Sequence, residues 1–244
     1  MQWAVILVLV ALNALLFAVP TPSGLAVTFL DVGQGDAILI EGPTGVQVLI
    51  DGGRDSGVLR ELSPRLPFWD RSLDAVIATH PDADHIGGLP SVLERYQVAH
   101  ILEPGVPNDT GVWNQFVGAV NAELQNNAAR HIVARRGMRL ALGGSAHADI
   151  LYPISDVASV KDTNSGSIVV RVVYGNTSFM LTGDAPVSVE YEILRGDSVV
   201  ASTVLKAGHH GSKTSSSEEW VAAVAPQYVI FSRGCDNRYG HPAE

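Results

Sequence analysis

The chain has 244 residues and a single cysteine, Cys235, so it is long enough for one large α/β domain and cannot form an intrachain disulfide framework. A hydrophobic content of 46% against 17% charged residues excludes a disordered chain. The formal net charge of −9 argues against broad electrostatic affinity for nucleic acid, which depends on clustered Lys and Arg, unless bound cations reverse the local field.

An apolar run of 17 residues, Trp3 to Val19, opens the chain, and Asn13 is its only polar residue. As a helix this run would extend about 25 Å at ~1.5 Å per residue, slightly less than the ~30 Å hydrocarbon core of a bilayer. A signal peptide would need a basic leading segment and a buried core helix would show a polar face, and the run has neither. We therefore expect residues 1–19 to form a transmembrane helix or membrane anchor. Residues 20–24 (PTPSG) then form a short, stiff linker, and residues 25–244 form the folded domain.

The rest of the chain alternates between short apolar runs bounded by turn residues and longer runs with helical periodicity. Strands lead, then strands and helices alternate in a pattern that half-repeats, which is typical of two sheets packed face to face with helices outside. Ser215 and Glu218 have capping-box spacing at the start of the last helix. We expect helices at residues 58–62, 88–96, 112–127, 186–194 and 216–223, and strands at residues 25–30, 37–41, 46–50, 73–78, 98–102, 131–134, 148–151, 167–173, 178–181, 199–205 and 228–231.

A dense group of metal-ligand side chains lies in residues 79–88 (THPDADHIGG), directly after the predicted strand at 73–78. Two imidazoles and two carboxylates fall within six residues, and both donor types suit zinc, manganese or iron. Gly87 and Gly88 then lead into the next predicted helix. The candidate ligands therefore lie on a tight loop at the carboxyl end of a strand, where open α/β sheets place their chemistry.

The spacing of this group resembles the His-x-His-x-Asp-His signature of the metallo-β-lactamase superfamily, with Asp82 in place of the second histidine. Three further runs resemble the other motifs of that family and occur in the same order: LIDGG at 49–53, LTGD at 181–184 and LKAGHHGS at 205–212. The resemblance covers roughly residues 25–241. It implies an α/β fold, the four-layer αββα metallo-β-lactamase sandwich, and a hydrolase.

Finer details resemble the C-terminal hydrolase domain of ComEC-type DNA-uptake (competence) proteins. They are the Asp82 substitution and the runs FLDVGQGDA at 29–37, HHGSKTSS at 209–216 and YGHP at 239–242. In that family the domain follows a bundle of transmembrane helices, degrades one strand of incoming DNA, and continues for another helix and strand. The resemblance implies a C-terminally truncated hydrolase domain, anchored in a bacterial cell membrane and lying on its extracytoplasmic side.

The resemblance also implies a centre of two divalent metal ions, zinc or manganese, with Asp184 bridging them. The side chains expected to bind metal are His80, Asp82, Asp84, His85, Asp184 and His209. His209 is chosen over His210 because it comes first after its strand, and His210 would then meet the substrate.

The first metal site lacks one imidazole, because residues 161–167 (KDTNSGS), where the family's third histidine should fall, contain none. Its affinity should be weaker, and harder ions such as manganese become plausible beside zinc. Asn164 could supply an amide oxygen there or serve the turn. We expect Asp51 to orient the metal-binding loop by hydrogen bonds and not to bind metal itself.

Catalytic and substrate-binding roles fall on groups around the metals. The side chains expected to take part in catalysis are Asp84, Lys206, His210 and His241. Ser212, Lys213 and Thr214, with Lys206, form a polar, partly basic loop suited to phosphate oxygens, although a plain solvated loop has the same composition. His241 precedes Pro242 on a late turn and could hold a phosphate or donate a proton.

These residues together indicate a metal-dependent phosphodiesterase. Two cations about 3.5–4 Å apart activate a water and clamp both sides of an in-line displacement, and no Gly-x-Ser-x-Gly elbow is present. We expect a DNase that acts on single- or double-stranded DNA beside a transmembrane channel region of the same or a longer protein. Two alternatives remain: hydrolysis of a cell-wall or membrane-polymer phosphodiester, and an inactive structural module, which the missing histidine favours.

Overall fold

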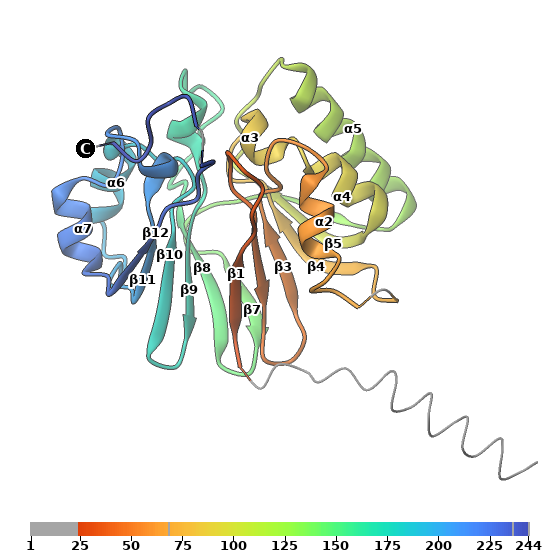
Figure 1. Cartoon of the computed structure of the whole chain (residues 1–244), viewed down its shortest axis with the longest axis horizontal. Helices are drawn as coiled ribbons and strands as arrows, with labels where there is room; N and C mark the ends of the chain where they lie inside the picture. Colours follow the sequence, from red (N-terminus) through yellow and green to blue (C-terminus); the bar gives the residue numbers. More distant parts are fainter. Residues whose placement is uncertain (1–23, 68, 236, 244) are drawn as a thin grey trace, which may run out of the picture.

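The computed structural model describes residues 24–67, 69–235 and 237–243. Two six-stranded sheets pack face to face in the centre, and helices cover the outer face of each sheet (Figure 1). The expected four-layer α/β sandwich is therefore confirmed.

The first sheet has the order β1-β2-β3-β4-β5-β6. Strands β3 to β6 are parallel, whereas β2 runs antiparallel to both β1 and β3. Its strands are β1 (Ala26–Phe29), β2 (Ile38–Glu41), β3 (Gln47–Ile50), β4 (Ser72–Ile77), β5 (Gln97–Glu103) and β6 (Arg130–Val133). The helices on its side are α2 (Gly57–Leu62), α3 (Ala83–Ile86), α4 (Leu89–Arg95) and α5 (Gly111–Asn126).

The second sheet has the order β12-β11-β10-β9-β8-β7, and β10, β11 and β12 are parallel. Its strands are β7 (Arg139–Gly143), β8 (Ala146–Tyr152), β9 (Val169–Tyr174), β10 (Thr177–Leu181), β11 (Val204–Lys206) and β12 (Tyr228–Ile230). Helices α6 (Val187–Leu194) and α7 (Glu218–Val224) cover its outer face. Two short 3₁₀ turns, η1 (Thr163–Gly166) and η2 (Gly208–Gly211), lie in loops between the strands.

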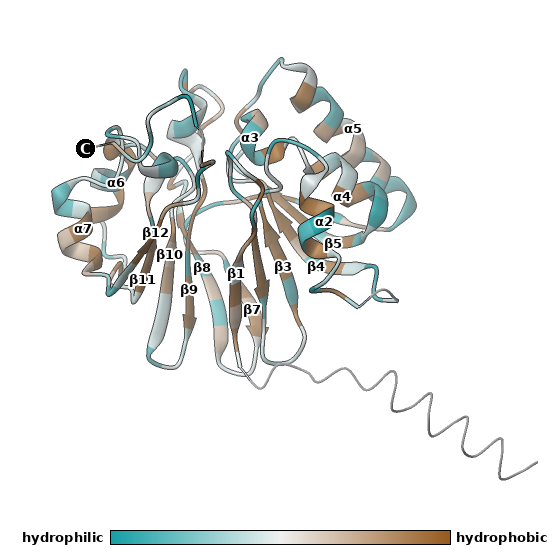
Figure 2. Cartoon of the chain, viewed as in Figure 1, coloured by the Kyte–Doolittle hydropathy of each residue, from teal (hydrophilic) through white to brown (hydrophobic). Residues whose placement is uncertain are grey.

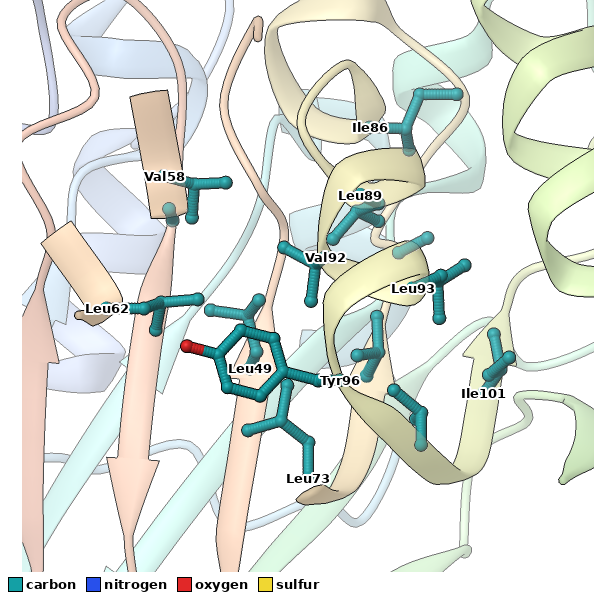
Figure 3. Close-up of a cluster of buried hydrophobic side chains, with 14 of the residues drawn as sticks. Leu49, Val58, Leu62, Leu73, Ile86, Leu89, Val92, Leu93, Tyr96 and Ile101 are labelled. Carbon is teal, nitrogen blue, oxygen red and sulfur yellow. The ribbon is translucent and has the colours of Figure 1, made fainter. Parts of the chain in front are cut away.

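Alternation of side chains along the strands builds the layers. In β2, Ile38 and Ile40 point into the core between the sheets, whereas Leu39 points into the core under the helices. Strand β2 is therefore apolar on both faces, and brown colours much of the central strands in Figure 2. Leu89 and Val92 of α4 pack against Leu49 of β3 in this outer core (Figure 3).

Gly87 and Gly88 let the metal-ligand loop and α4 approach the backbone that follows β3. A Cβ on Gly87 would lie 2.0 Å from the carbonyl oxygen of Arg54, and one on Gly88 would lie 2.1 Å from that of Gly52. No side chain fits at such distances. The glycine pair therefore fixes the loop against the sheet edge.

Several local expectations were wrong in detail. The predicted strand at 199–205 is reduced to β11, because Ser202 donates its backbone N–H to Val224 of α7 (2.9 Å) and Val199 is 65% exposed. The last helix begins at Glu218 and is capped by Ser217, whose hydroxyl accepts from the N–H of Trp220, so the capping box from Ser215 is not formed. Strand β7 and helix α3 were not predicted.

The expected transmembrane helix at residues 1–19 and most of the linker lie outside the described residues. Among the residues that are described, none of the helices combines the length and the apolar character needed to cross a membrane.

Candidate metal centre

The candidate residues converge on one edge of the sandwich. The LIDGG, THPDADHIGG, LTGD and LKAGHHGS runs follow β3, β4, β10 and β11, whose carboxyl ends meet at the edge drawn uppermost in Figure 1. The segment before β2, which runs the opposite way, reaches the same edge and carries Asp36. Both sheets therefore contribute to the site.

Asp51 organises the part of the site that comes from the first sheet. Its backbone has a positive φ of 59° and its side chain is fully buried. One carboxylate oxygen accepts from the backbone N–H of Thr79 (2.8 Å), and the other accepts from the Thr79 hydroxyl (2.7 Å) and from Nδ1 of His85 (2.8 Å). Asp51 thus joins the end of β3 to the metal-ligand loop, in the orienting role expected for it.

Hydrogen bonds fix the tautomers of three buried histidines. The Thr79 hydroxyl gives its proton to Asp51, so its oxygen accepts from Nδ1 of His80 (3.0 Å). Nδ1 of His85 donates to Asp51, and Nδ1 of His210 donates to the carbonyl of Ser232 (2.8 Å). In the neutral ring each Nε2 atom therefore carries the lone pair, and all three Nε2 atoms are buried without a hydrogen-bond partner. This is the arrangement of metal-binding imidazoles.

Carboxylates face these lone pairs. Oδ2 of Asp184 lies 3.3 Å from Nε2 of His85 and 3.4 Å from Nε2 of His210, and Oδ2 of Asp84 lies 3.5 Å from Nε2 of His210. An imidazole lone pair and a carboxylate oxygen repel each other unless a cation lies between them. The donor set therefore fits a divalent metal ion.

The pKa shifts of the buried histidines also show that the site favours a positive charge. Burial opposes protonation of His85, but Asp184 and Asp51 outweigh it and raise its pKa well above the ordinary value. For His210, the neighbouring carboxylates of Asp36 and Asp84 overcome burial and raise the pKa to about 9. In contrast, burial and the neighbouring His85 lower the pKa of His80 to about 4, which keeps that imidazole neutral.

A second set of donors lies beside the first. The rings of His80 and His85 are 4.1 Å apart between centroids, and Oδ2 of Asp82 lies 3.8 Å from Nε2 of His80. The other carboxylate oxygen of Asp82 accepts from the hydroxyl of Thr163 in η1 (2.7 Å). Asn164, also in η1, has a buried amide oxygen with no hydrogen-bond partner. This side of the centre contains one imidazole and is otherwise built from oxygen donors.

The structure brings both His209 and His210 to the centre but at different depths. His210 is buried and faces Asp84 and Asp184, whereas His209 is 30% exposed with its Nε2 atom 3.7 Å from Asp184. Both residues have positive φ values, 47° and 57°, within η2. This rare backbone conformation aims two consecutive rings at one carboxylate. His210 therefore has the more enclosed ligand position.

Lys206 is buried inside the centre and does not line an open loop. Its amine contacts Asp36 and donates to the carbonyl of Gly183 (2.9 Å), and it lies 3.6 Å from Oδ1 of Asp184. Burial alone would lower the pKa of this amine, but Asp36 and Asp184 raise it. The side chain is thus a fixed internal cation beside the expected bridging carboxylate.

Asp36 is the site residue that sequence reasoning missed. With His85, Asp184 and His210 it forms a buried cluster whose ligand atoms all lie within 4.8 Å of one another. Its carboxylate, however, approaches the Nδ1 side of the imidazoles, at 4.0 Å from His85 and 3.5 Å from His210, and it is paired with Lys206. Its place is therefore behind the ligands, where it supports them. Its position between a glycine and the buried start of β2 was the available sequence signal.

The remaining candidates line the rim. Ser212 is buried and its hydroxyl lies 3.0 Å from that of Thr214, which also contacts Nδ1 of His209 (3.2 Å). Lys213 is exposed and makes no ion pair among the described residues. The ring of His241 lies 5.9 Å from that of His209, between centroids.

Comparison with known proteins finds one family model and several curated relatives that are similar to this chain. Residues 30–133 match the family model of the metallo-beta-lactamase superfamily. The chain is 31% identical over 237 residues to ComE operon protein 3 of Bacillus subtilis and 32% identical over 244 residues to Competence protein ComA of Neisseria gonorrhoeae. The matches cover 88% and 99% of this chain but 29% and 32% of the relatives, so the chain spans about a third of their length.

Two solved structures share the fold. CmlA, a diiron beta-hydroxylase from Streptomyces venezuelae, is similar with a TM-score of 0.57 and 15% identity, over 92% of this chain and 49% of that one. Igni18, a metallo hydrolase from the archaeon Ignicoccus hospitalis, has a TM-score of 0.50 and 14% identity, over 85% and 82%. At these identities the likeness concerns the fold alone.

Proposed function

This chain carries a domain of the metallo-β-lactamase superfamily related to ComEC-type competence proteins, and from that premise we propose that it is a metal-dependent phosphodiesterase that cleaves DNA. The observation that carries the proposal is the convergence of the Nε2 atoms of His85 and His210 on the carboxylates of Asp84 and Asp184, with Nε2 of His80 beside them facing Asp82.

The chain offers ligands for two divalent ions, zinc or manganese. His85, His210 and Asp84 would hold one ion, and His80 and Asp82 the other, with Asp184 between them. Such ions would supply an activated water at neutral pH and neutralise charge that develops on the phosphoryl oxygens. The second set is rich in oxygen donors, which favours manganese there.

The other residues position these ligands and meet the substrate. Asp51 and Thr79 hold two imidazoles in the required tautomer, and the buried Lys206 limits repulsion between Asp36 and Asp184. His209 is partly exposed, and with Lys213 at the rim it is placed to contact a phosphate that reaches the centre.

DNA is the proposed substrate because one curated relative is named Competence protein ComA and another, from Haemophilus influenzae, is named Recombination protein 2. We propose that residues 1–19 anchor the domain in a bacterial membrane, on the extracytoplasmic side, next to a transmembrane channel region. The net charge of −9 suits a nuclease that receives its substrate from a channel and needs little affinity of its own.

Metal dependence is the first test. The chain is stripped with a chelator, reloaded with zinc or manganese, and assayed on bis-p-nitrophenyl phosphate and on labelled single- and double-stranded DNA. We expect the stripped protein to be inactive and the reloaded protein to hydrolyse both classes of diester. Undiminished turnover after exhaustive chelation would exclude this mechanism.

The choice of substrate separates the alternatives. Hydrolysis of the small diester without cleavage of DNA would favour a cell-wall or membrane polymer as substrate. Stoichiometric metal binding without any hydrolysis would favour an inactive structural module.

A further inference from the structure

We propose that a cleft beside the metal centre, lined by Gln34, Arg54 and residues 237–239, is a nucleotide subsite for single-stranded nucleic acid. In this subsite Tyr239 stacks on a base, and Arg54 and Arg238 bind the flanking phosphates. The inference rests on the proposed function and deepens it, because it states which strand form the site accepts and which residues hold it.

The cleft is linked to the metal centre by a row of aromatic rings. Nε2 of His209 lies 3.7 Å from Asp184, the rings of His209 and His241 are 5.9 Å apart, and those of His241 and Tyr239 are 5.8 Å apart. A strand whose scissile phosphate lies at Asp184 would therefore pass these rings. Figure 1 shows the C-terminal segment running along the same upper edge as the loops of the centre.

Tyr239 has the exposure and orientation of a stacking platform. The residue is 51% exposed, and its ring lies nearly parallel to that of His241, with an interplanar angle of 13°. The exposed guanidinium of Arg238 covers the phenol ring at 5.5 Å and makes no ion pair among the described residues, so it is free to move to a phosphate and uncover the ring. Stacking of this kind tolerates any base.

Arg54 supplies a second unpaired charge to the lining of the cleft. It is exposed and, like Arg238, forms no ion pair within the described part of the chain. In a chain with a net charge of −9, two unneutralised arginines in one cleft are a local exception. Guanidinium groups bind phosphate bidentately and stack on bases, which suits a nucleotide better than a simple anion.

The wall that carries Tyr239 is held in place before any ligand binds. The side-chain amide of Asn237 donates to the carbonyls of Gly234 (3.0 Å) and His241 (2.9 Å), and its oxygen accepts from the N–H of His241 (2.9 Å). Gln34, from the first sheet, accepts from the N–H of Gly234 (3.2 Å). A preorganised wall loses little conformational entropy on binding.

The size of the cleft limits what it accepts. Its volume is about 260 Å³, below the ~300–1,000 Å³ of sites that enclose drug-sized ligands. One nucleotide of a single strand can lay its base on Tyr239 there. A paired base inside a duplex presents no free face, so the subsite selects single strands.

The experiment compares hexathymidylate with an abasic hexamer of the same charge, both labelled with fluorescein, by anisotropy on the chelator-treated full chain. We expect the wild-type chain to bind the oligonucleotide about tenfold more tightly than the abasic strand. Tyr239→Ala should remove that preference, whereas Tyr239→Phe should keep it within about twofold. Arg54→Gln should weaken both strands equally. The matched controls Tyr228→Ala, an exposed tyrosine at the start of β12, and Arg60→Gln, an exposed arginine on α2, should change neither.

Each other result overturns the proposal. No preference for bases in the wild type, an unchanged preference in Tyr239→Ala, or a loss in Tyr239→Phe as large as in Tyr239→Ala would remove the stacking role. Equal competition by inorganic polyphosphate would show that charge alone is recognised. Because binding is measured without metal, an inactive but base-selective chain would contradict the proposed hydrolysis and leave the subsite intact. An active chain without base selectivity would support the proposed hydrolysis and contradict the subsite.

Discussion

Thr79 connects the carboxylate of Asp51 to the ligand His80 through a single hydroxyl. The hydroxyl donates to Asp51 (2.7 Å) and accepts from Nδ1 of His80 (3.0 Å), so it sets which ring nitrogen faces the metal. Thr79→Val should keep the shape of the side chain but remove the hydroxyl that connects Asp51 to His80. We expect the affinity for metal to fall about 10–100-fold, measured by isothermal titration. Thr177→Val, at an exposed position at the start of β10, is the matched control. Equal affinities in wild type and Thr79→Val would mean that this hydroxyl does not orient His80.

Asp51 and His85 should differ in the severity of their loss. Asp51 accepts three hydrogen bonds, and the amide of Asn can still accept some of them, so Asp51→Asn should retain weakened metal binding. His85→Ala removes an expected metal-ligand nitrogen that lies 3.3 Å from Asp184. This change should abolish both metal binding and activity. Metal content after dialysis and turnover of bis-p-nitrophenyl phosphate measure the two effects. If the Asp51 variant were as impaired as the His85 variant, the carboxylate would have to be a ligand itself.

Asp82 distinguishes the first site from the commoner two-histidine arrangement. Its carboxylate faces His80 at 3.8 Å and accepts from Thr163. Burial raises the pKa of Asp82 although the hydrogen bond from Thr163 opposes the shift, so a cation beside this carboxylate would stabilise its charged form. Asp82→His should shift the preference of this site from manganese towards zinc, because imidazole is the softer donor. Competition titrations with the two metals test this, and an unchanged ratio would indicate that Asp82 does not touch metal.

Lys206 joins two elements, the end of β11 in the second sheet and the segment before β2 in the first. Lys206→Met would leave Asp36 buried without its partner, and we expect the free energy of unfolding to fall by about 3–5 kcal/mol. The double variant Lys206→Met with Asp36→Leu should recover most of this loss, since Asp36 is then no longer a buried unpaired charge and Asp184 keeps its contacts with His85 and His210. Urea unfolding in the presence of a chelator measures the free energy of unfolding without the stabilisation that bound metal adds. If Lys206→Met alone were as stable as the wild type, the pair of Lys206 and Asp36 would not link the two sheets.

The elements differ in how far the sequence predicts them. The strand ending at Ile77 alternates at its start, where Ser72 and Asp74 are exposed and Leu73 is buried, and ends in a buried apolar run, and its prediction is confirmed. Helix α3 was missed because it has only four residues and two of them, Asp84 and His85, carry ligand side chains, which leaves no helical periodicity to detect. Strand β7 was missed because it is short, lies at a sheet edge and buries only Leu142, so its sequence lacks the alternation of a half-buried strand.

The sequence likewise predicts the candidate metal centre only in part. Motif order predicts which loops meet, because the carboxyl ends of parallel strands lie together. It does not predict which of His209 and His210 is more deeply buried, since that depends on two left-handed residues in η2. The role of Asp36 depends on Lys206, 170 positions away, a contact that local patterns do not contain.

At the scale of the whole molecule, the centre exists only when both halves are assembled. Asp51, Thr79 and His85 come from the first sheet, and Asp184 and His210 from the second, so packing between the sheets places the ligands. The core between the sheets combines residues of both, among them Ile38 and Ile77 with Ile150 and Val170. Any loss of packing in this core is therefore expected to weaken metal binding as well as stability.

The same reasoning defines what the domain needs to fold. Both described sheets and the three hydrophobic cores are built from residues at or after Leu25. Deleting residues 1–20 should therefore leave a folded domain with the same circular dichroism spectrum and the same turnover of a small diester. The comparison uses the whole 244-residue chain and the shortened chain under the same conditions. If the shortened protein were unfolded while the whole chain was folded, residues 3–19 would have to contribute to the core, and the proposal that they anchor the domain in a membrane would fall.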